Sequence, residues 1–237
     1  MATYIYAIVG AEHPLRLDGT AGVGEPAQEI RVLRADRLAA VASDVPEGLR
    51  AKRRDVLAHQ RVLDRLLQDG AVLPMRFGLV APDDEQAVAA IAADTDRYTE
   101  RLAELDGCRE YNLKVTRDED DLLRQIVAEV PEARRLNELT RAEPGDPGRK
   151  VALGELLAVE TRNRQEHDAV GIIAGLEPRA AGRSDAKPTA ACFLNTSFLV
   201  SEDRAEEFVR AVEDEADRRG TGYAFTLNGP LPPYSFV

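Results

Sequence analysis

The three histidines of this 237-residue chain are its best candidates for catalysis or metal binding, because imidazole acts near neutral pH as a general base and a metal ligand. No HxH or HxxxH spacing joins His13, His59 and His167. His59 falls on the apolar stripe of an expected helix, which indicates a core or interface histidine. His13 precedes a proline in an expected loop and indicates a surface role, and His167 between two acidic residues indicates a solvated charge pair. The histidines therefore predict neither a catalytic residue nor a metal site.

The other chemically active residue types also lack the spacing that their chemistry needs. Gly19, Gly22 and Gly24 form neither a GxGxxG fingerprint nor a P-loop with its lysine, so they indicate a flexible turn. No serine lies in a GxSxG elbow. The acidic residues at 202–203 and 213–215 fall on the polar side of an expected helix and indicate a solubilising role. No catalytic residue and no cofactor is predicted.

The charge balance argues against a nucleic-acid partner. The chain carries 31 basic and 42 acidic side chains, a net charge of −11, and would repel a phosphate backbone unless its basic residues were segregated. The densest basic cluster, Arg50 with residues 52–54, is followed at once by Asp55 and an amphipathic helix, which indicates a solvated helix start. Aromatic residues make up only 5%, so little material is present for base stacking.

Composition predicts a soluble cytoplasmic protein without a membrane partner. No apolar run approaches the roughly 18 residues that a membrane span needs. No basic leader precedes the short apolar run at residues 3–9, so no secretory signal is expected. Cys108 and Cys192 lack metal-ligand spacing and are interpreted as buried thiols rather than as a disulfide.

The first 116 residues alternate between strand and helix signals. In order, we expect strands at 3–9, 28–33 and 38–43, a helix at 50–68, an edge strand or tight bend at 71–80, one helix from 83 to 106, and a returning strand at 108–115. This is the element order of a ferredoxin-like α/β sandwich. The sequence thus predicts an α/β (α+β) protein whose N-terminal domain, residues 1–116, is ferredoxin-like.

The rest of the chain predicts a helical connector, residues 117–148, and a smaller α/β domain, residues 149–237. Short helices are expected at 118–130 and 131–139, followed by a Pro/Gly loop at 143–148. The second domain is expected to contain a helix at 149–173 buried through Val151, Leu153, Leu156, Leu157 and Val159, a mobile loop at 178–188, a strand at 189–200, a helix after Ser201 and a strand at 223–227.

Residues 71–80 and the C-terminal tail, residues 229–237, suggest an interaction surface. Arg76 stands among apolar neighbours and needs a partner, which is either a helix carboxylate of this chain or another protein. Three prolines in the tail remove backbone donors and fix φ at about −65°, which predicts an extended segment and neither a helix nor a central strand. The tail's apolar side chains predict docking on the protein's own surface or on a partner: Leu231, Tyr234, Phe236 and Val237.

At these two segments the chain resembles the GvpL/GvpF family of gas vesicle proteins, and its GvpF-type branch in particular. The resemblance rests on Leu73-Pro74-Met75-Arg76-Phe77-Gly78 and on the terminal Gly-Pro-Leu-Pro-Pro-Tyr-Ser-Phe-Val. Residues 4–9 and 193–200 are also similar to that family, so the resemblance covers essentially the whole chain. Leu79 departs from it, since a small polar residue is expected there.

The resemblance implies a non-enzymatic two-domain protein that serves gas vesicle formation as a minor structural component or an assembly factor. The implied partners are the small hydrophobic shell protein, of GvpA type, and other gas vesicle proteins, and the implied location is the gas vesicle. No catalytic residues carry over from the family. The candidate partner-binding residues are Leu73, Pro74, Arg76, Phe77, Gly78, Leu231, Pro232, Pro233, Tyr234 and Phe236.

Two expectations about function follow. A sheet edge, an apolar groove near residues 73–80, or both receive the shell protein by strand addition or helix docking, and the tail orders part of that surface. Removing residues 230–237 should therefore abolish binding while leaving the fold cooperative. The alternative is a small-ligand-binding or enzymatic ferredoxin-like domain with an unrecognised carboxylate site. A deep pocket with converging titratable groups and displaced pKa values would favour that alternative.

Overall fold

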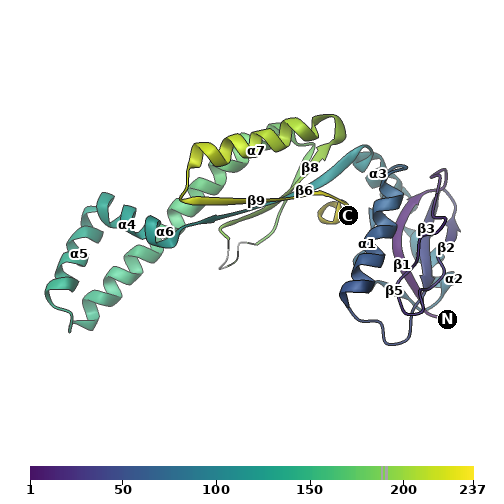
Figure 1. Cartoon of the computed structure of the whole chain (residues 1–237), viewed down its shortest axis with the longest axis horizontal. Helices are drawn as coiled ribbons and strands as arrows, with labels where there is room; N and C mark the ends of the chain where they lie inside the picture. The colour runs from purple at the N-terminus through teal and green to yellow at the C-terminus, as the bar shows by residue number, and fades with distance from the viewer. Residues whose placement is uncertain (188, 190–191) are drawn as a thin grey trace. The chain divides into compact units, whose positions relative to one another are not determined.

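The computed structural model describes residues 1–187, 189 and 192–237, and it confirms the mixed α/β class (Figure 1). The described residues form two antiparallel sheets and seven α-helices. Contacts divide the chain into two compact units: unit 1 is 1–111, 199–202 and 229–237, and unit 2 is 112–198 and 203–228. The domain boundaries predicted at residues 116 and 148 separate domains that fold independently. Contact-based units do not test independent folding, so these boundaries stay predictions.

Unit 1 is built on a five-stranded sheet whose central strand is β1. Its strands are β1 (Thr3–Gly10), β2 (Arg31–Ala35), β3 (Leu38–Asp44), β4 (Leu73–Pro74) and β5 (Val80–Ala81). The order is β2-β3-β1-β4, and β5 also pairs with β1. Strand β2 begins three residues later than expected, because Gln28 instead pairs with the preceding loop, its N–H donating to Val23 and its carbonyl accepting from Gly22. The bend expected within 71–80 is confirmed, since it separates β4 from β5.

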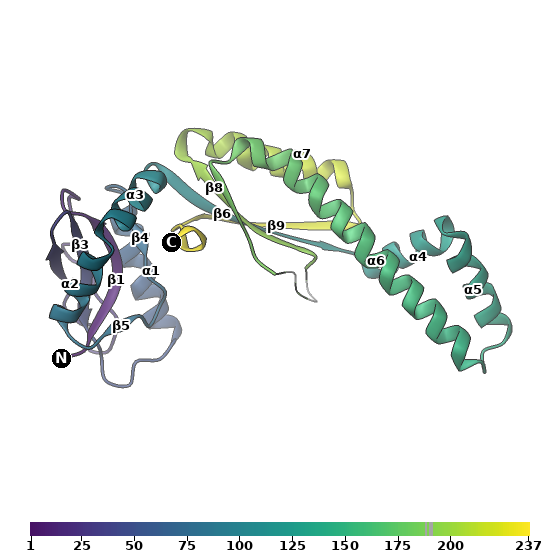
Figure 2. The same ribbon diagram turned by 180° about the vertical axis from the view of Figure 1, so that it is seen from behind.

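Helices cover both faces of this sheet. Helix α1 (Arg53–Leu67) packs Val62, Leu63 and Leu66 against one face of β1. Helices α2 (Asp84–Ala93) and α3 (Thr95–Leu105) pack against the other face and stand in front of the sheet in Figure 2. The single helix expected from 83 to 106 was wrong. It breaks at Asp94, whose φ of −116° and ψ of 23° lie outside the helical range.

The second sheet has the order β7-β8-β6-β9. Its strands are β6 (Cys108–Arg117), β7 (Gly182–Asp185), β8 (Leu194–Ser201) and β9 (Tyr223–Leu231). The strand expected at 108–115 therefore forms, but within this sheet rather than the first. The loop expected at 178–188 contains strand β7, and the strand expected at 189–200 begins at Leu194, because Thr189 and Cys192 close a local bridge on each other. Residues 188, 190 and 191 of these two expectations lie outside the described residues.

Four helices belong to unit 2: α4 (Glu119–Glu129), α5 (Pro131–Ala142), α6 (Pro147–Leu176) and α7 (Ala205–Arg219). Helices α6 and α7 lie side by side over one face of the second sheet (Figure 1). The predicted burial along α6 was wrong for Val151 and Val159, whereas Leu153, Leu156 and Leu157 are half-buried, the last two against the apolar cluster of α4 and α5. Val151 and Val159 remain 58% and 50% exposed. Short 3₁₀ turns complete the chain at Glu177–Arg179, Glu202–Arg204 and Tyr234–Phe236.

Three further findings concern the described residues. Cys108 and Cys192 are buried and form no disulfide, as predicted. No helix in the described part of the chain combines the length and apolarity that a membrane crossing requires. Nowhere in that part do three or more His, Cys, Asp or Glu side chains gather in a way that could hold a metal ion.

Candidate partner-binding surface

A closed chain of hydrogen bonds fixes residues 75–78 to the core of unit 1. His59 is 2% exposed, and its Nε2 lies 3.0 Å from the Met75 carbonyl, which can only accept. Nε2 therefore carries the proton, and Nδ1 accepts from the Tyr4 hydroxyl at 2.8 Å. The Tyr4 oxygen in turn accepts from the Gly78 N–H at 3.3 Å. His59 is thus a core histidine, as predicted, and it sets the position of this segment.

Aromatic rings surround this chain of bonds. Tyr6 stacks on His59 with 5.5 Å between centroids, and Phe77 meets His59 edge-on at 5.8 Å. Burial lowers the pKa of His59 and raises that of Tyr4, because both rings are more stable uncharged in this apolar surrounding. The neutral forms that the hydrogen-bond chain requires are therefore the ones that the core favours.

The free energy of unfolding is expected to decrease as the pH falls below about 6.5. The pKa of His59 in the folded state is below its ordinary value. As the pH falls, the unfolded chain therefore binds the proton first, and this proton binding stabilises the unfolded state relative to the folded state. The contribution of neutral His59 to the free energy of unfolding is complete above about pH 6.5. It is lost progressively as the pH falls from there to the pKa of His59 in the folded state. Urea unfolding of the wild type and His59→Gln between pH 5 and 7.5 checks this. In the variant, the free energy of unfolding should depend less steeply on pH. Some dependence should remain because burial also lowers the pKa of His13. Equal slopes in the two proteins would contradict the role assigned to His59.

Residues 76–79 form an exposed turn beyond that anchor. The Leu79 N–H donates to the Arg76 carbonyl at 3.1 Å, and Gly78 has a φ of 90°, which favours glycine. Arg76 is exposed and forms no ion pair with any described residue, so the first of its two expected partners, a helix carboxylate, is absent there. Leu79 and Val80 are each 43% exposed. The turn thus presents one unpaired cation beside two apolar side chains.

The C-terminal tail docks on unit 1. Tyr234 packs against the apolar cluster on the α1 side of the sheet, and Phe236 packs against the cluster on the α2–α3 side. Between them, Ser235 donates its backbone N–H at 2.8 Å and its hydroxyl at 2.7 Å to the carboxylate of Glu110, which is 4% exposed. The tail was expected to be extended. It is so only as far as Leu231, the last residue of β9, and closes in a 3₁₀ turn.

The structure separates the ten candidate residues into buried and accessible groups. Leu73, Pro74, Pro232 and Pro233 are buried and serve the fold. The others are half-buried or exposed: Arg76, Phe77, Gly78, Leu231, Tyr234 and Phe236. Burial, with nearby Asp64 and Glu110, raises the pKa of Tyr234 to about 12, so its ring stays neutral. A hollow of about 290 Å³ lies between the α1 end and the tail, lined by Asp64, Leu67, Gln68, Arg109, Pro230, Leu231 and Pro232.

Sequence reasoning did not single out two residues that hold this surface together. Glu110 anchors the tail from 125 positions away, and Tyr4 links β1 to the turn. The alternation of β6 gave no signal for Glu110, because Asn112 and Lys114, which follow it at the same spacing, are polar. His13, expected at the surface, is half-buried and lies 3.1 Å from the Leu66 carbonyl.

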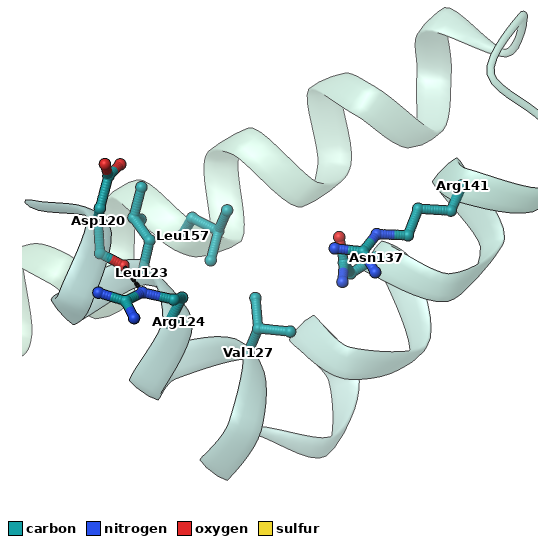
Figure 3. A pocket seen from close by; sticks show the side chains of 7 residues that line it. All are labelled: Asp120, Leu123, Arg124, Val127, Asn137, Arg141 and Leu157. Carbon is teal, nitrogen blue, oxygen red and sulfur yellow. Dashed lines mark hydrogen bonds between the residues drawn. The ribbon is translucent and has the colours of Figure 1, made fainter.

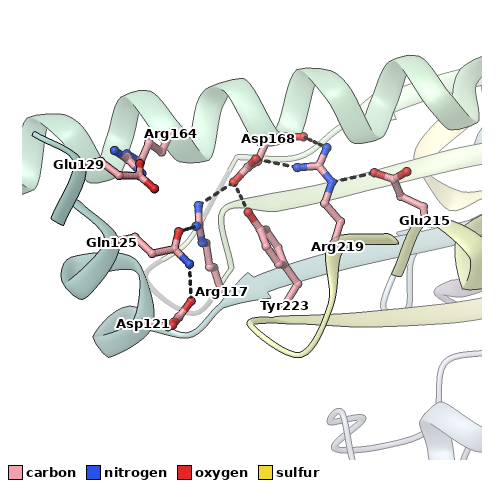
Figure 4. A network of polar contacts seen from close by, with 9 residues as sticks. All are labelled: Arg117, Asp121, Gln125, Glu129, Arg164, Asp168, Glu215, Arg219 and Tyr223. Carbon is pink, nitrogen blue, oxygen red and sulfur yellow. Dashed lines mark hydrogen bonds and ion pairs between the residues drawn. The ribbon is translucent and has the colours of Figure 1, made fainter. Parts of the chain in front are cut away.

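Unit 2 holds a dense polar network around Asp168, which is 9% exposed (Figure 4). The Asp168 carboxylate accepts from Arg117 at 3.0 Å, Arg219 at 2.6 Å and the Tyr223 hydroxyl at 2.6 Å. Burial, and then the hydrogen bond to Asp168, raises the pKa of Tyr223. Glu215, expected on the polar side of its helix, is 7% exposed and binds Arg219 at 2.9 Å. These groups neutralise one another, as expected for a structural ion cluster.

A hollow of about 350 Å³ borders this network and is lined by Arg117, Asn163, Arg164, His167, Asp168 and Tyr223. Several titratable side chains converge on this hollow, which is the arrangement that the alternative of an enzymatic or small-ligand-binding domain predicts. The carboxylate is already held by three donors, however, and Arg164 is paired with Glu129 at 2.7 Å. His167 is exposed, as predicted, but the expected charge pair is absent among the described residues, because Asp168 is buried and bonds to Arg117, Arg219 and Tyr223 instead.

The chain was compared with known proteins. The family model "Gas vesicle synthesis protein GvpL/GvpF" matches residues 2–237. The chain is 43% identical over 238 residues to gas vesicle protein F of Streptomyces sp. (strain CB03234), covering 100% of both chains. It is 29% identical to gas vesicle protein L of the same strain, covering 99% of this chain and 92% of the other.

Two solved structures share the fold. The crystal structure of GvpF from Anabaena sp. PCC7120 has a TM-score of 0.85 at 21% identity, covering 99% of this chain and 97% of that one. GvpF from Microcystis aeruginosa has a TM-score of 0.80 at 23% identity, covering 99% and 98%. The match of the family model over nearly the full length, together with the 43% identical relative, establishes that the chain belongs to the GvpL/GvpF family of gas vesicle proteins.

Proposed function

We propose that this protein is a non-enzymatic assembly factor or minor component of the gas vesicle that binds the small hydrophobic shell protein. Membership in the family supports a role in gas vesicle formation. The shell protein as partner, and the gas vesicle in the cytoplasm as location, are parts of the proposal. A shell subunit exposes apolar and strand-edge surface before it polymerises, and such surface aggregates unless it is covered.

The exposed turn at residues 76–79 carries the proposal. It offers an unpaired guanidinium together with exposed Leu79 and Val80, a combination that suits the centre of a protein interface. The hydrogen-bond chain through Tyr4 and His59 holds this turn before any partner arrives. A pre-positioned turn loses little conformational entropy on binding, which favours affinity.

The sheet edge beside the turn supports strand addition as the mode of binding. Strands β4 and β5 are two residues long and both pair with β1, and β4 stands at the end of the strand order β2-β3-β1-β4. An extended apolar segment of the shell protein would pair along this edge, while the turn contacts its side chains. The tail then acts by fixing the neighbouring core through Tyr234 and Phe236.

Arg76→Glu is expected to weaken binding of the shell subunit by at least about tenfold, because it reverses the only unpaired charge of the turn. Arg76 makes no ion pair within the described residues, so thermal stability should stay within about 0.5 kcal/mol of the wild type. A saturable pull-down with purified shell subunit measures the binding.

The matched control is Arg61→Glu, an exposed α1 arginine that likewise has no ion pair in the described structure. If Arg76→Glu and Arg61→Glu bind as the wild type does, the turn is not the contact. If the wild type itself fails to bind, the direct-contact proposal fails as a whole.

A further inference from the structure

Strand β2 leaves one edge of the first sheet open (Figure 1). It stands at one end of the strand order β2-β3-β1-β4, and β4 stands at the other. Ala35 and Leu38 are paired across a two-residue turn, so they exchange both backbone hydrogen bonds of their pair. Because such pairs alternate along an antiparallel ladder, the N–H and the carbonyl of Val32 point away from β3. No backbone hydrogen bond outside the ladder reaches Val32 from the residues that the structure describes.

A hollow of about 310 Å³ lies beside this open edge, between β2 and the loop that precedes it. Four apolar side chains supply one part of its lining: Leu15, Leu17, Ile30 and Val32. The first three are half-buried against the apolar cluster on the α1 side of the sheet, and Val32 is 37% exposed. A side chain directly opposite Val32 on an added strand would point to the same face as Val32 and reach this hollow.

The titratable lining of the hollow is entirely acidic. It consists of Asp18 and Glu29, which are exposed and form no ion pair with any described residue. The neighbouring arginines bond elsewhere in unit 1: Arg16 to Asp69, Arg31 to Asp44 and Asp84, Arg34 to a loop carbonyl, and Arg65 to a loop carbonyl and Gln68. Arg34 has no counter-ion in the described structure, but it lies outside the lining, beyond Val32 along β2. The charge along the edge therefore runs from negative at Glu29 to positive at Arg34.

The groove between α4, α5 and α6 (Figure 3) has no such preference for one sign of charge. This hollow of about 500 Å³ is lined by Asp120 and Arg141, neither of which has an ion pair among the described residues. Its charges of both signs select no occupant, whereas the acidic lining beside β2 selects a cation.

We propose that the β2 edge binds an extended segment of another protein, which adds to the sheet as a strand, places an apolar side chain in the hollow and pairs a basic side chain with Asp18 and Glu29. In an antiparallel addition, the apolar residue lies opposite Val32 and exchanges both backbone hydrogen bonds with it. The residue two positions later then lies toward Glu29 and is basic, and the residue two positions earlier faces Arg34 and is neutral or acidic. The site is at the other end of the strand order from β4, so it does not depend on the proposed shell-protein contact.

The test uses the full-length protein and a fluorescein-labelled, threonine-rich peptide of about eight residues, with a central isoleucine and a lysine two positions after it. A second peptide carries glutamate in place of the lysine. A third carries an N-methyl group on the isoleucine nitrogen, which removes the donor to the Val32 carbonyl. Fluorescence anisotropy should give saturable binding of the lysine peptide and binding at least about tenfold weaker for each of the other two. No saturable binding of the lysine peptide up to about 1 mM, or an affinity that either change leaves unaltered, overturns the proposal.

Glu29→Lys should weaken binding of the lysine peptide by about three- to tenfold, because it replaces an attraction by a repulsion. The matched control is Glu100→Lys, which changes the net charge equally. Glu100 is exposed on α3, on the other face of the sheet, and has no ion pair in the described part of the chain. Equal losses in both variants would mean non-specific charge attraction and would defeat the proposal. Arg76→Glu should leave the affinity for the peptide unchanged, and a loss there as large as that of Glu29→Lys would contradict binding at β2.

Discussion

Replacing Asp168 with asparagine is expected to lower the free energy of unfolding by about 3–5 kcal/mol. The Asp168 carboxylate is the common acceptor for Arg117 and Arg219, whose side chains are 7% and 15% exposed. Asparagine keeps the shape but removes the negative charge, so both guanidiniums lose their shared counter-ion in a poorly hydrated site. The cost is that of uncompensated buried charge, which exceeds the net value of the intact ion pairs.

Urea unfolding at pH 7.5 measures this loss, and thermal unfolding should show a decrease in Tm of roughly 6–20 °C for a chain of this size. Asp217→Asn is the matched control, because Asp217 is exposed on α7 and has no ion pair in the described structure. Its stability should stay within about 0.5 kcal/mol of the wild type. A loss below about 1 kcal/mol for Asp168→Asn would show that water or Glu215 compensates the two arginines.

Ending the chain at Gly229 is expected to destabilise unit 1 by about 3–6 kcal/mol, whether or not a partner binds there. The truncation removes Tyr234 and Phe236 from the clusters on the two faces of the first sheet. It also takes away both Ser235 donors from buried Glu110. The lost apolar burial and the loss of two hydrogen bonds to a buried carboxylate each contribute a share of this cost.

Removing the tail would affect both the stability of unit 1 and the binding of a partner, so a truncated chain does not by itself separate the two. Binding lost on truncation would follow from loosening of unit 1 alone, so the stability of the truncated chain must be measured beside its binding. Val237→Asp separates the two effects, because Val237 is 52% exposed and its replacement leaves the anchors in place. A truncated chain that unfolds at the same urea concentration as the wild type would refute the structural role of the tail.

Local signals in the sequence specified the helices, strands and turns of the chain wherever those signals were strong. Apolar periodicity located the helices of both units, and turn residues located the bend between β4 and β5. The same periodicity placed His59 on a buried helix face, and residues 73–78 together with the proline-rich tail indicated the family. These features depend on neighbours within a few positions, so the sequence records them directly.

Long-range packing, which no local pattern records, sets which elements and side chains meet. Residues 108–117 have the pattern of a strand in either sheet, and pairing with β8 and β9, far along the chain, placed them in the second. The apolar positions of α6 predicted burial, but burial requires a covering element, and no element that the structure describes covers Val151 or Val159. Glu110 and Ser235, 125 residues apart, and Asp168 with Arg117 and Arg219 are likewise joined by packing alone. A local pattern specifies what a segment can bury, whereas long-range packing determines what buries it.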